Sequence, residues 1–401
     1  MVTEKSEGAL EGLRVLDLTR ILAGPLCGQM LGDMGADVIK VEPPGTGDDT
    51  RTWGPPFIEG ESAYFLGINR NKRSLTLNMA VKAGQKILAD LIKTSDVVVE
   101  NFKLGTLEKW GITNDWLEKS APRVVRCSIT GYGSSGPDAA LPGYDFILQA
   151  ESGLMSICGE QDGPPTKYGV AIVDVVTGLY ACNSILAALA ARERTGRGQH
   201  VEVCLYDSGI AMLINVASNY LVSGKDARCF GNGHPSIVPY TTYPTADSMI
   251  AVAVGNDGQF ARFAETIGRG EWARDARFSK NPDRVASRDL LDRLIAQALE
   301  SGKTAAWIEK LRAAGVPCGP INTVAEALTD PHTLARDMVR TVKHPKAGDL
   351  KMVGIPFRMN GTPPSIRRPP PLLGQHTEEV LGGELGLSAS RIAQLRAEKV
   401  I

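Results

Sequence analysis

Short apolar runs alternate with helical patterns through the first third of the chain. An apolar run at 13–18 is followed by a helical pattern at 24–34 and by a second apolar run at 36–41. Two further helix-then-strand stretches, each ending in residues rich in Val or Ile, cover 84–99 and 115–129. Because strands and helices in alternation form βαβ units, the pattern predicts an α/β domain with a parallel sheet and flanking helices.

The glycines of the first βαβ unit do not form a dinucleotide-binding motif. They lie at 24, 28, 32 and 35, which is not the G-x-G-x-x-G spacing, although Glu42 lies about where a ribose-binding acid would. A nicotinamide site is therefore disfavoured. The four-residue repeat places Gly24, Gly28 and Gly32 on one helix face, where they allow close packing.

The length and composition predict more than one packed unit. A chain of 401 residues is too long for one ordinary core. We expect 1–223 to form the first part of a large domain and 224–330, which starts with a turn-rich linker, to form a smaller α/β domain. Residues 331–401 are expected to return to the large domain. The smaller domain is expected to contain a strand at 249–254 and helices at 257–268, 287–300 and 304–314, and the chain to end in a helix from 388.

The charge and residue usage favour a small-molecule partner. A formal net charge of −1 provides no basic field for nucleic acid or an anionic membrane. No run approaches the roughly 18 apolar residues of a membrane span without a charge or Gly, and the N-terminus lacks a signal-peptide core, so a cytoplasmic protein is expected. The seven Cys and five His lack ligand spacing, which predicts buried reduced thiols and no metal site.

Asp174 is a single carboxylate in the otherwise uncharged stretch 170–180. It precedes a long apolar run at 175–190, so the commoner interpretation is a helix N-cap contributing about 1 kcal/mol. The second interpretation is a nucleophilic carboxylate, whose anion the helix N-terminus stabilises while nearby backbone N–H groups stabilise charge that develops in acyl transfer. The two roles can coexist.

Ten short motifs follow one another along nearly the whole chain. They are GLRVLDLT (12–19), LAGP (22–25), GDMGADVIKVE (32–42), NKRS (71–74), VENF (99–102), GYG (131–133), GYD (143–145), GRGQ (196–199), VPCGP (316–320) and LLGQHT (372–377). In their order and spacing the chain resembles the class III coenzyme A transferases, the formyl-CoA transferase-like family. The runs at 48–56, 236–240 and 369–377 are most similar to members that use succinyl-CoA with glutarate or hydroxymethylglutarate.

The resemblance implies a CoA-transferase that moves CoA from a donor, succinyl-CoA, to a dicarboxylic acid such as glutarate. It also implies a homodimer whose two chains pass through one another as interlocked rings. In the family mechanism Asp174 attacks the donor thioester, giving a mixed anhydride and then an aspartyl-CoA thioester. The CoA thioester is itself a substrate, so no further cofactor is implied.

Several residues match the CoA-contacting positions of the family. Lys109 would meet a phosphate and Phe102 would cover pantetheine or adenine; the alternatives are a solvated Lys on a helix and a core Phe. Lys72 and Arg73 are further phosphate candidates, or charges on an edge strand. The matching positions are Ile21, Leu22, Ala23, Leu77, Asn101, Phe102, Lys109 and Tyr144.

The substrate positions centre on a short glycine loop. Gly231, Gly233 and His234 lie in GNGH, which resembles in shortened form the family loop that closes over the acyl intermediate; the alternative is an interdomain turn. Arg51 is the first candidate to hold the distal carboxylate of glutarate, and His234 is the second. Leu22 and Pro43 stand where oxalate-using members carry polar or basic side chains, which disfavours oxalate.

Two other functions remain open from the sequence. The α-methylacyl-CoA racemase branch of the same fold pairs a His with the Asp, and Tyr144 stands at that His position here. A phenol with a pKa of about 10 is a poor substitute for imidazole at neutral pH. The third possibility is a catalytically silent acyl-CoA-binding protein, against which the intact Asp174 argues.

Overall fold

A computed structural model describes residues 8–401, and its contacts divide the chain into two compact units. The first unit contains the described residues up to Leu154, Tyr168–Ala217 and His332–Ile401. The second contains Met155–Lys167 and Ser218–Pro331. The expected boundaries near 223 and 330 thus differ by a few residues, and the sequence did not indicate that 155–167 joins the second unit. Most of the N-terminal run used to argue against a signal peptide lies outside the described residues.

The first unit is built on a six-stranded parallel sheet, which confirms the predicted fold class. Its strand order is β5-β2-β1-β6-β7-β8. The strands are β1 (Arg14–Asp17), β2 (Asp37–Glu42), β5 (Lys72–Thr76), β6 (Val97–Glu100), β7 (Val125–Thr130) and β8 (His200–Cys204).

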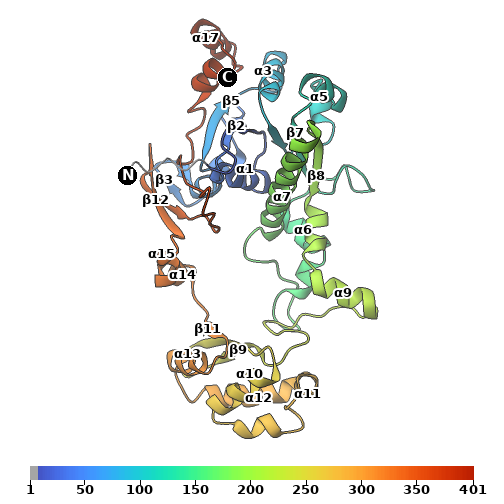
Figure 1. Ribbon diagram of the computed structural model, residues 1–401, viewed down its shortest axis with the longest axis vertical. Coiled ribbons are helices and arrows are strands. Elements are labelled where there is room, and N and C mark those ends of the chain that lie inside the picture. Colours follow the sequence, from blue (N-terminus) through green and yellow to red (C-terminus); the bar gives the residue numbers. More distant parts are fainter. Residues whose placement is uncertain (1–7) are drawn as a thin grey trace. The chain divides into compact units, whose positions relative to one another are not determined.

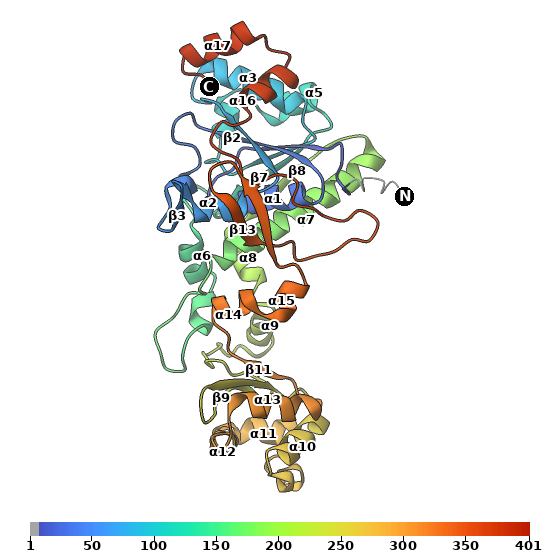
Figure 2. The ribbon, with the colours of Figure 1, turned by 90° about the vertical axis from the view of Figure 1, so that its left-hand side faces the viewer.

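Helices cover both faces of this sheet, as the nearly continuous apolar strands require. Successive strand residues point to opposite faces, so Val15 packs in one core with α1 (Ala23–Asp33) and α7 (Ile172–Thr195), and Leu16 packs in the other with α3 (Lys82–Lys93). The second core also receives α16 (Thr377–Gly383) and α17 (Ala389–Ala397), which lie at the same end of the sheet as α3 (Figures 1 and 2).

Helix α7 is the core helix that carries Asp174. Within residues 8–401 it alone has the length and hydropathy of a membrane span, so the expectation that no segment reaches that threshold is wrong by this measure. The indication is weak, because Val173, Ala181 and Ile185 are fully buried against the sheet and α1. The helix ends where Gly196 adopts a left-handed conformation (φ 72°).

The remaining elements of the first unit are short. The hairpin of β12 (Val339–His344) and β13 (Gly348–Val353) was not predicted from the sequence. The others are η1 (Asp49–Thr52), β3 (Phe57–Ile58), β4 (Glu61–Ser62), α2 (Ala63–Ile68), α4 (Thr106–Lys109), α5 (Asn114–Ser120), α6 (Asp145–Glu151), the first residue of η2 (Leu154–Ile157), α8 (Leu205–Ala211), the start of α9 (Ile214–Ser223), and most of α15 (Pro331–Ala335).

The second unit is a small α/β domain, as predicted, and its sheet has three antiparallel strands, of which the sequence indicated only the one at 249–254. Its order is β11 (Cys318–Pro320), β10 (Met249–Ala253) and β9 (Tyr240–Pro244). Phe260, Phe263 and Leu291 fill the core between the sheet and its helices. These helices are α10 (Asp257–Thr266), η3 (Gly270–Arg274), α11 (Asn281–Ala286), α12 (Arg288–Leu299) and α13 (Thr304–Ala313), followed by α14 (Val324–Thr329).

Candidate active site

Asp174 lies in the first turn of α7, but it does not cap the helix. The helix begins at Ile172, and the capping position, Ala171, provides no side-chain hydrogen bond. Asp145 instead accepts hydrogen bonds at Oδ1 from the backbone N–H groups of Val173 (2.8 Å) and Asp174 (3.2 Å). The capping role predicted for Asp174 was therefore wrong, because a carboxylate from α6 occupies that position.

The backbone donors at this helix end are already satisfied. Besides the two that Asp145 receives, the N–H of Ile172 donates to Val170 O (2.8 Å) and the N–H of Val175 donates to Ala171 O (3.1 Å). These groups are not free to bind an oxyanion, in contrast to the expectation from the sequence. Because other groups accept these hydrogen bonds, the Asp174 side chain is not needed to cap its own helix.

Asp145 is itself held by a buried glutamine. Gln149, which is 1% exposed and lies one turn further along α6, donates from Nε2 to Asp145 Oδ2 (2.6 Å). Its Oε1 accepts from the N–H of Tyr168 (2.8 Å). A hydrogen-bonded chain therefore joins α6, the segment before α7 and the first turn of α7, and it fixes the backbone on which Asp174 stands.

The electrostatics of Asp174 differ from those of an ordinary carboxylate. Burial, and then the neighbouring Asp145 carboxylate, raise the pKa of Asp174 to about 7. The same two acids, after burial, raise the pKa of Tyr64, whose ring packs edge-on against Trp53 with centroids 5.1 Å apart. A partly desolvated carboxylate with such a pKa is typical of functional sites.

The loop between β1 and α1 lies against the same helix. A Cβ added to Gly178, one turn after Asp174, would lie 2.7 Å from the carbonyl oxygen of Ala23. Only glycine permits this approach. It brings Ala23, and with it the preceding Ile21 and Leu22, close to the first turns of α7.

Ile21 has a strained backbone that neighbouring side chains hold in place. Its φ of 74° is rare for a β-branched residue and costs about 1–3 kcal/mol. Asn101 accepts from the N–H of Arg20 (3.1 Å) and donates to its carbonyl (2.9 Å), while Asp48 Oδ1 accepts from the N–H of Ile21 (3.3 Å). Asn101 thus positions the loop.

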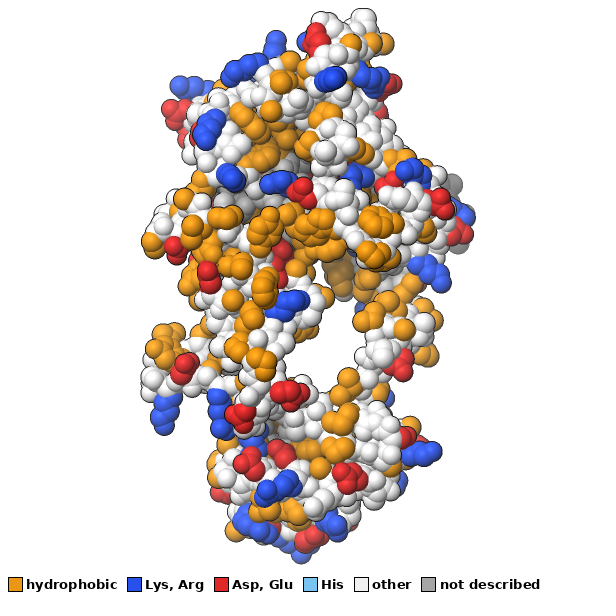
Figure 3. Space-filling model, turned by 180° about the vertical axis from the view of Figure 1, so that it is seen from behind, with side chains coloured by type: hydrophobic (Ala, Val, Ile, Leu, Met, Phe, Trp, Pro, Cys, Tyr) orange, Lys and Arg blue, Asp and Glu red, His pale blue; other side chains and the backbone are white. Residues whose placement is uncertain are grey.

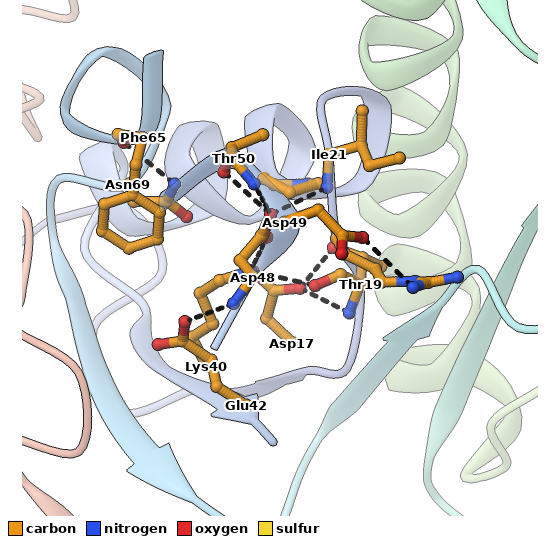
Figure 4. A network of polar contacts seen from close by, with 12 residues as sticks. Asp17, Thr19, Ile21, Lys40, Glu42, Asp48, Asp49, Thr50, Phe65 and Asn69 are labelled. Carbon is orange, nitrogen blue, oxygen red and sulfur yellow. Dashed lines mark hydrogen bonds and ion pairs between the residues drawn. The ribbon is translucent and has the colours of Figure 1, made fainter. Parts of the chain in front are cut away.

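A buried ionic network supports this loop from below (Figure 4). Lys40 pairs with Asp48 (2.8 Å) and donates to Thr19 O (2.9 Å), with both side chains of the pair almost fully buried. Burial raises the pKa of Asp48, but the Lys40 charge and the hydrogen bonds from Thr50 outweigh it and leave a value of about 2. Asp48 is therefore a permanent anion that connects β2, η1 and Ile21.

Lys72 and Arg73 belong to the protein's own ionic network, and the structure contradicts a phosphate-binding role for them. The fully buried Lys72 ammonium contacts Asp17 Oδ2 (2.8 Å), Pro25 O (2.7 Å) and Asn69 Oδ1 (2.9 Å), which uses all three of its protons. Arg73 pairs with Asp37, Glu379 and Glu384. Strand β5 is at the edge of the sheet, but the C-terminal segment covers it.

The geometry also argues against a substrate role for Arg51. Its Nε and one terminal nitrogen bind both oxygens of Glu42 (2.7 and 2.8 Å), and it donates to Pro371 O (3.2 Å). The guanidinium stacks on Phe65 at 3.6 Å from the ring centroid. Only 9% of the Arg51 side chain is exposed, and Glu42 balances its charge. The pair of N–H groups that could bind a second carboxylate is therefore already occupied.

The other predicted CoA-contacting residues differ in exposure. Tyr144 (59% exposed) and Lys109 present free side chains, and Lys109 makes no side-chain hydrogen bond or ion pair within residues 8–401. Phe102 packs edge-on against Trp110 (5.3 Å) beside the core. Leu77 is fully buried, as Leu22 and Ala23 nearly are, so these positions could contact a ligand mainly through their backbone.

The predicted glycine loop belongs to the second unit, whereas Asp174 belongs to the first. Gly231 is in the left-handed region (φ 58°). His234 accepts at Nδ1 from the N–H of Ser236 (3.1 Å), and Arg288 donates to the His234 carbonyl (2.9 Å). These contacts hold the loop against α12.

The sequence reasoning missed Asp145, Gln149, Asp48 and Tyr64. The available signal for Asp145 is its place in the GYD motif, in which the family resemblance indicates a role only for Tyr144. Gln149 lies four residues later, one helical turn away, but that spacing alone indicates no function. Nothing in the sequence connects Asp145 to a helix that begins 27 residues later.

Comparisons with known proteins agree on one family. The model of CoA-transferase family III matches residues 10–377. The chain is 41% identical to the human succinyl-CoA:glutarate CoA-transferase, covering 98% of this chain and 90% of that protein. It is 44% identical to the succinate–glutarate CoA-transferase of Agrobacterium fabrum (93% and 94% covered). A crystal structure of a CAIB/BAIF family protein from Brucella suis superposes with a TM-score of 0.84, 43% identity, and 94% and 99% coverage.

Proposed function

The chain belongs to CoA-transferase family III, and we propose that its reaction moves CoA from succinyl-CoA to glutarate. The observation that carries the choice of substrates is the 41–44% identity, over nearly the full chain, to relatives named for this pair of acids. The enzyme is a CoA-transferase, acting on an acyl-CoA and a dicarboxylic acid.

We propose that Asp174 is the nucleophile. Its carboxylate oxygen attacks the thioester carbonyl of succinyl-CoA, the C–S bond breaks, and CoA leaves as the thiolate. The thiolate attacks the aspartyl carbonyl of the resulting anhydride and releases succinate. Glutarate then attacks the aspartyl-CoA thioester, and the returning thiolate forms glutaryl-CoA and restores Asp174. The raised pKa and the lack of any capping duty support this role.

The side chains around Asp174 would act by positioning. Asp145 fixes the first turn of α7 through two backbone hydrogen bonds, and Asn101 fixes the Ile21 loop beside it. Ile21, Tyr144 and Lys109 would contact CoA, with Lys109 meeting a phosphate as a point charge. Gly231, Gly233 and His234 would cover the acyl intermediate.

We also propose a homodimer. Ile214 (72%), Leu221 (80%) and Val222 (89%) of α9 are largely exposed, and Figure 3 shows further hydrophobic side chains exposed over the first unit. Apolar side chains gathered in this way are typical of an interface. Light scattering on the purified protein should give twice the monomer mass at micromolar concentration, and a monomer would contradict the proposal.

A substrate screen tests the reaction. Purified protein is incubated with succinyl-CoA and each of glutarate, hydroxymethylglutarate, itaconate, malate, mesaconate and oxalate, and new acyl-CoA masses are recorded. Glutaryl-CoA should form fastest and oxalyl-CoA slowest. Epimerisation of a 2-methylacyl-CoA without a free acid would indicate a racemase instead, and binding without turnover would indicate a silent acyl-CoA-binding protein.

A further inference from the structure

In the second unit, the partly exposed thiol of Cys229 lies against the backbone of Gly159, which directly follows the partly exposed Cys158 in the chain. Cys229 donates a hydrogen bond from Sγ to the carbonyl oxygen of Gly159 (2.7 Å), the residue next to Cys158. Both cysteines are free and intermediate in exposure. Burial, and then the nearby Cys229, raise the pKa of Cys158, which is consistent with the two sulfur atoms lying within electrostatic reach.

The backbone around each thiol forms part of a defined loop. Thr166 N–H donates to Cys158 O (3.3 Å) and Gly163 N–H donates to Glu160 O (3.0 Å), so residues 158–166 close on themselves. A Cβ placed on Gly231 would lie 3.7 Å from Glu160 Oε2 and 4.0 Å from Gly159 O. The 158–166 loop therefore lies against the glycine loop 229–234.

The other cysteines do not offer an equivalent pair. Cys27, Cys127, Cys182 and Cys204 are buried, and a buried thiol is shielded from oxidants in solution. Cys318 is intermediate in exposure, but its Sγ faces the carbonyl of Ile308 (3.8 Å). The expectation that the thiols would be buried thus holds for four cysteines and is wrong for Cys158, Cys229 and Cys318.

We propose that Cys158 and Cys229 form a redox modification site, in which a peroxide converts the two thiols into a disulfide that ties the 229–234 loop to the 158–166 loop. The sulfur of Cys229 attacks one peroxide oxygen, which gives a sulfenic acid and the first water. The sulfur of Cys158 then attacks that sulfenic sulfur and releases the second water. Two thiols and one hydrogen peroxide thus yield one disulfide and two waters, and a small dithiol reverses the change by exchange.

The disulfide would remove the freedom of the glycine loop. Gly231 and Gly233 are the residues that allow this loop to change conformation, and Cys229 lies two residues before Gly231. The expected effect on activity rests on the proposed function, in which this loop covers the acyl intermediate. Disulfide formation itself does not depend on that function.

The test treats the full-length protein with hydrogen peroxide and maps peptides without reduction by mass spectrometry. We expect a cross-linked peptide pair containing Cys158 and Cys229. Glutaryl-CoA formation should fall about tenfold or more and recover with dithiothreitol, because closing a loop gates turnover. Cys158→Ser and Cys229→Ser should give no cross-link and keep their activity in peroxide. Cys318→Ser is the matched control, a partly exposed thiol of the same unit, and should behave as the wild type.

Each contrary result has a distinct meaning. Absence of the cross-link from oxidised wild type would overturn the proposal, as would an equal, dithiol-reversible loss of activity in Cys158→Ser. A cross-link that leaves the rate unchanged would overturn the effect on the loop. If the protein forms the cross-link on oxidation but makes no glutaryl-CoA even before peroxide is added, the proposed function is contradicted and the proposed thiol pair is retained.

Discussion

Two carboxylates at one helix end have different duties in this protein. One carboxylate oxygen of Asp145 accepts hydrogen bonds from the backbone of α7, and the other accepts one from Gln149. The Asp174 side chain, in contrast, takes no part in capping its own helix. The proximity of Asp145 also contributes to the raised pKa of Asp174. At the level of single residues, one structural acid therefore positions a second, which is the proposed nucleophile.

Asp174→Ala and Asp174→Asn should abolish CoA transfer while CoA still binds, because in the proposed mechanism the carboxylate forms the covalent intermediate and does not anchor the ligand. The rate is measured as label exchange between succinyl-CoA and free succinate, and CoA affinity by calorimetry. The Asn variant controls for shape, since it keeps the side-chain volume. Near-native exchange in either variant would refute the assignment.

The raised pKa of Asp174 also makes a prediction about stability. Its pKa is about 7 in the folded protein against an ordinary value of 3.8, so the folded state binds the proton more tightly than the unfolded chain does. Ionisation of Asp174 therefore lowers the free energy of unfolding as pH rises from about 4 through about 7.

Asp174→Asn removes this penalty, so its stability advantage over the wild type should grow by about 1–3 kcal/mol between pH 5 and pH 8. Urea denaturation at the two pH values measures the difference. An advantage that stays constant with pH, or that shrinks toward pH 8, would show that Asp174 has an ordinary pKa. The transferase rate of the wild type should rise with pH through the same range, since the anion is the nucleophile.

At the scale of elements, the site depends on short segments that are joined by buried charges. Arg51 of η1 pairs with Glu42 at the end of β2 and reaches Pro371 of the C-terminal segment, while Asp48 links η1 to Ile21. These contacts hold the loop after β1 against α7. Arg51, which the sequence suggested as a substrate contact, instead stabilises the loops that would contact the ligand.

Arg51→Ala should accordingly destabilise the fold by about 3–5 kcal/mol, because it leaves Glu42 charged and buried without its partner. Its kcat/KM should fall alike for glutarate and for butyrate. Arg20→Ala is the matched control: Arg20 pairs with Asp49 at the surface, with 57% and 49% of the side chains exposed, and its loss should cost no more than about 1 kcal/mol. A loss confined to glutarate, with unchanged stability, would restore the substrate role.

At the scale of the whole molecule, the protein consists of two units. The first is a parallel sheet with helices on both faces, and the second is a smaller α/β unit formed by Ser218–Pro331 with Met155–Lys167. The candidate nucleophile stands on the first unit, and the glycine loop is carried by the second. Acyl transfer through a protein carboxylate does not require a metal ion. Within residues 8–401, no group of three or more His, Cys, Asp or Glu side chains is placed to hold one.

Exhaustive dialysis against EDTA should therefore leave the rate of glutaryl-CoA formation unchanged. The dialysed enzyme is assayed beside an undialysed sample and beside samples to which Mg²⁺, Mn²⁺ or Zn²⁺ is returned. A loss of activity that one metal restores would contradict the prediction, and with it the view that Asp174 needs no Lewis acid.

The layered architecture and the position of Asp174 could be predicted from the sequence alone. Strand and helix periodicities are local, so the runs at 13–18 and 36–41 and the pattern at 24–34 could be recognised without any distant contact. The expected helices at 257–268, 287–300 and 304–314 appear as α10, α12 and α13 with ends shifted by a few residues. Asp174 was conspicuous because a lone charge in an apolar segment is a local feature too.

The pairing of the charged groups could not be predicted and became apparent only in the folded chain. Arg51 and Lys72 look like free cations in the sequence, and their partners Glu42 and Asp17 lie 9 and 55 residues away with no pattern that connects them. The cap of α7 comes from Asp145, and residues 155–167 join a unit formed mainly by a later part of the chain. Periodicity along the sequence indicates which face of a helix or strand is apolar. It does not indicate which groups become partners, because that depends on how the elements pack. A buried charge needs such a partner, since leaving it unpaired costs several kcal/mol.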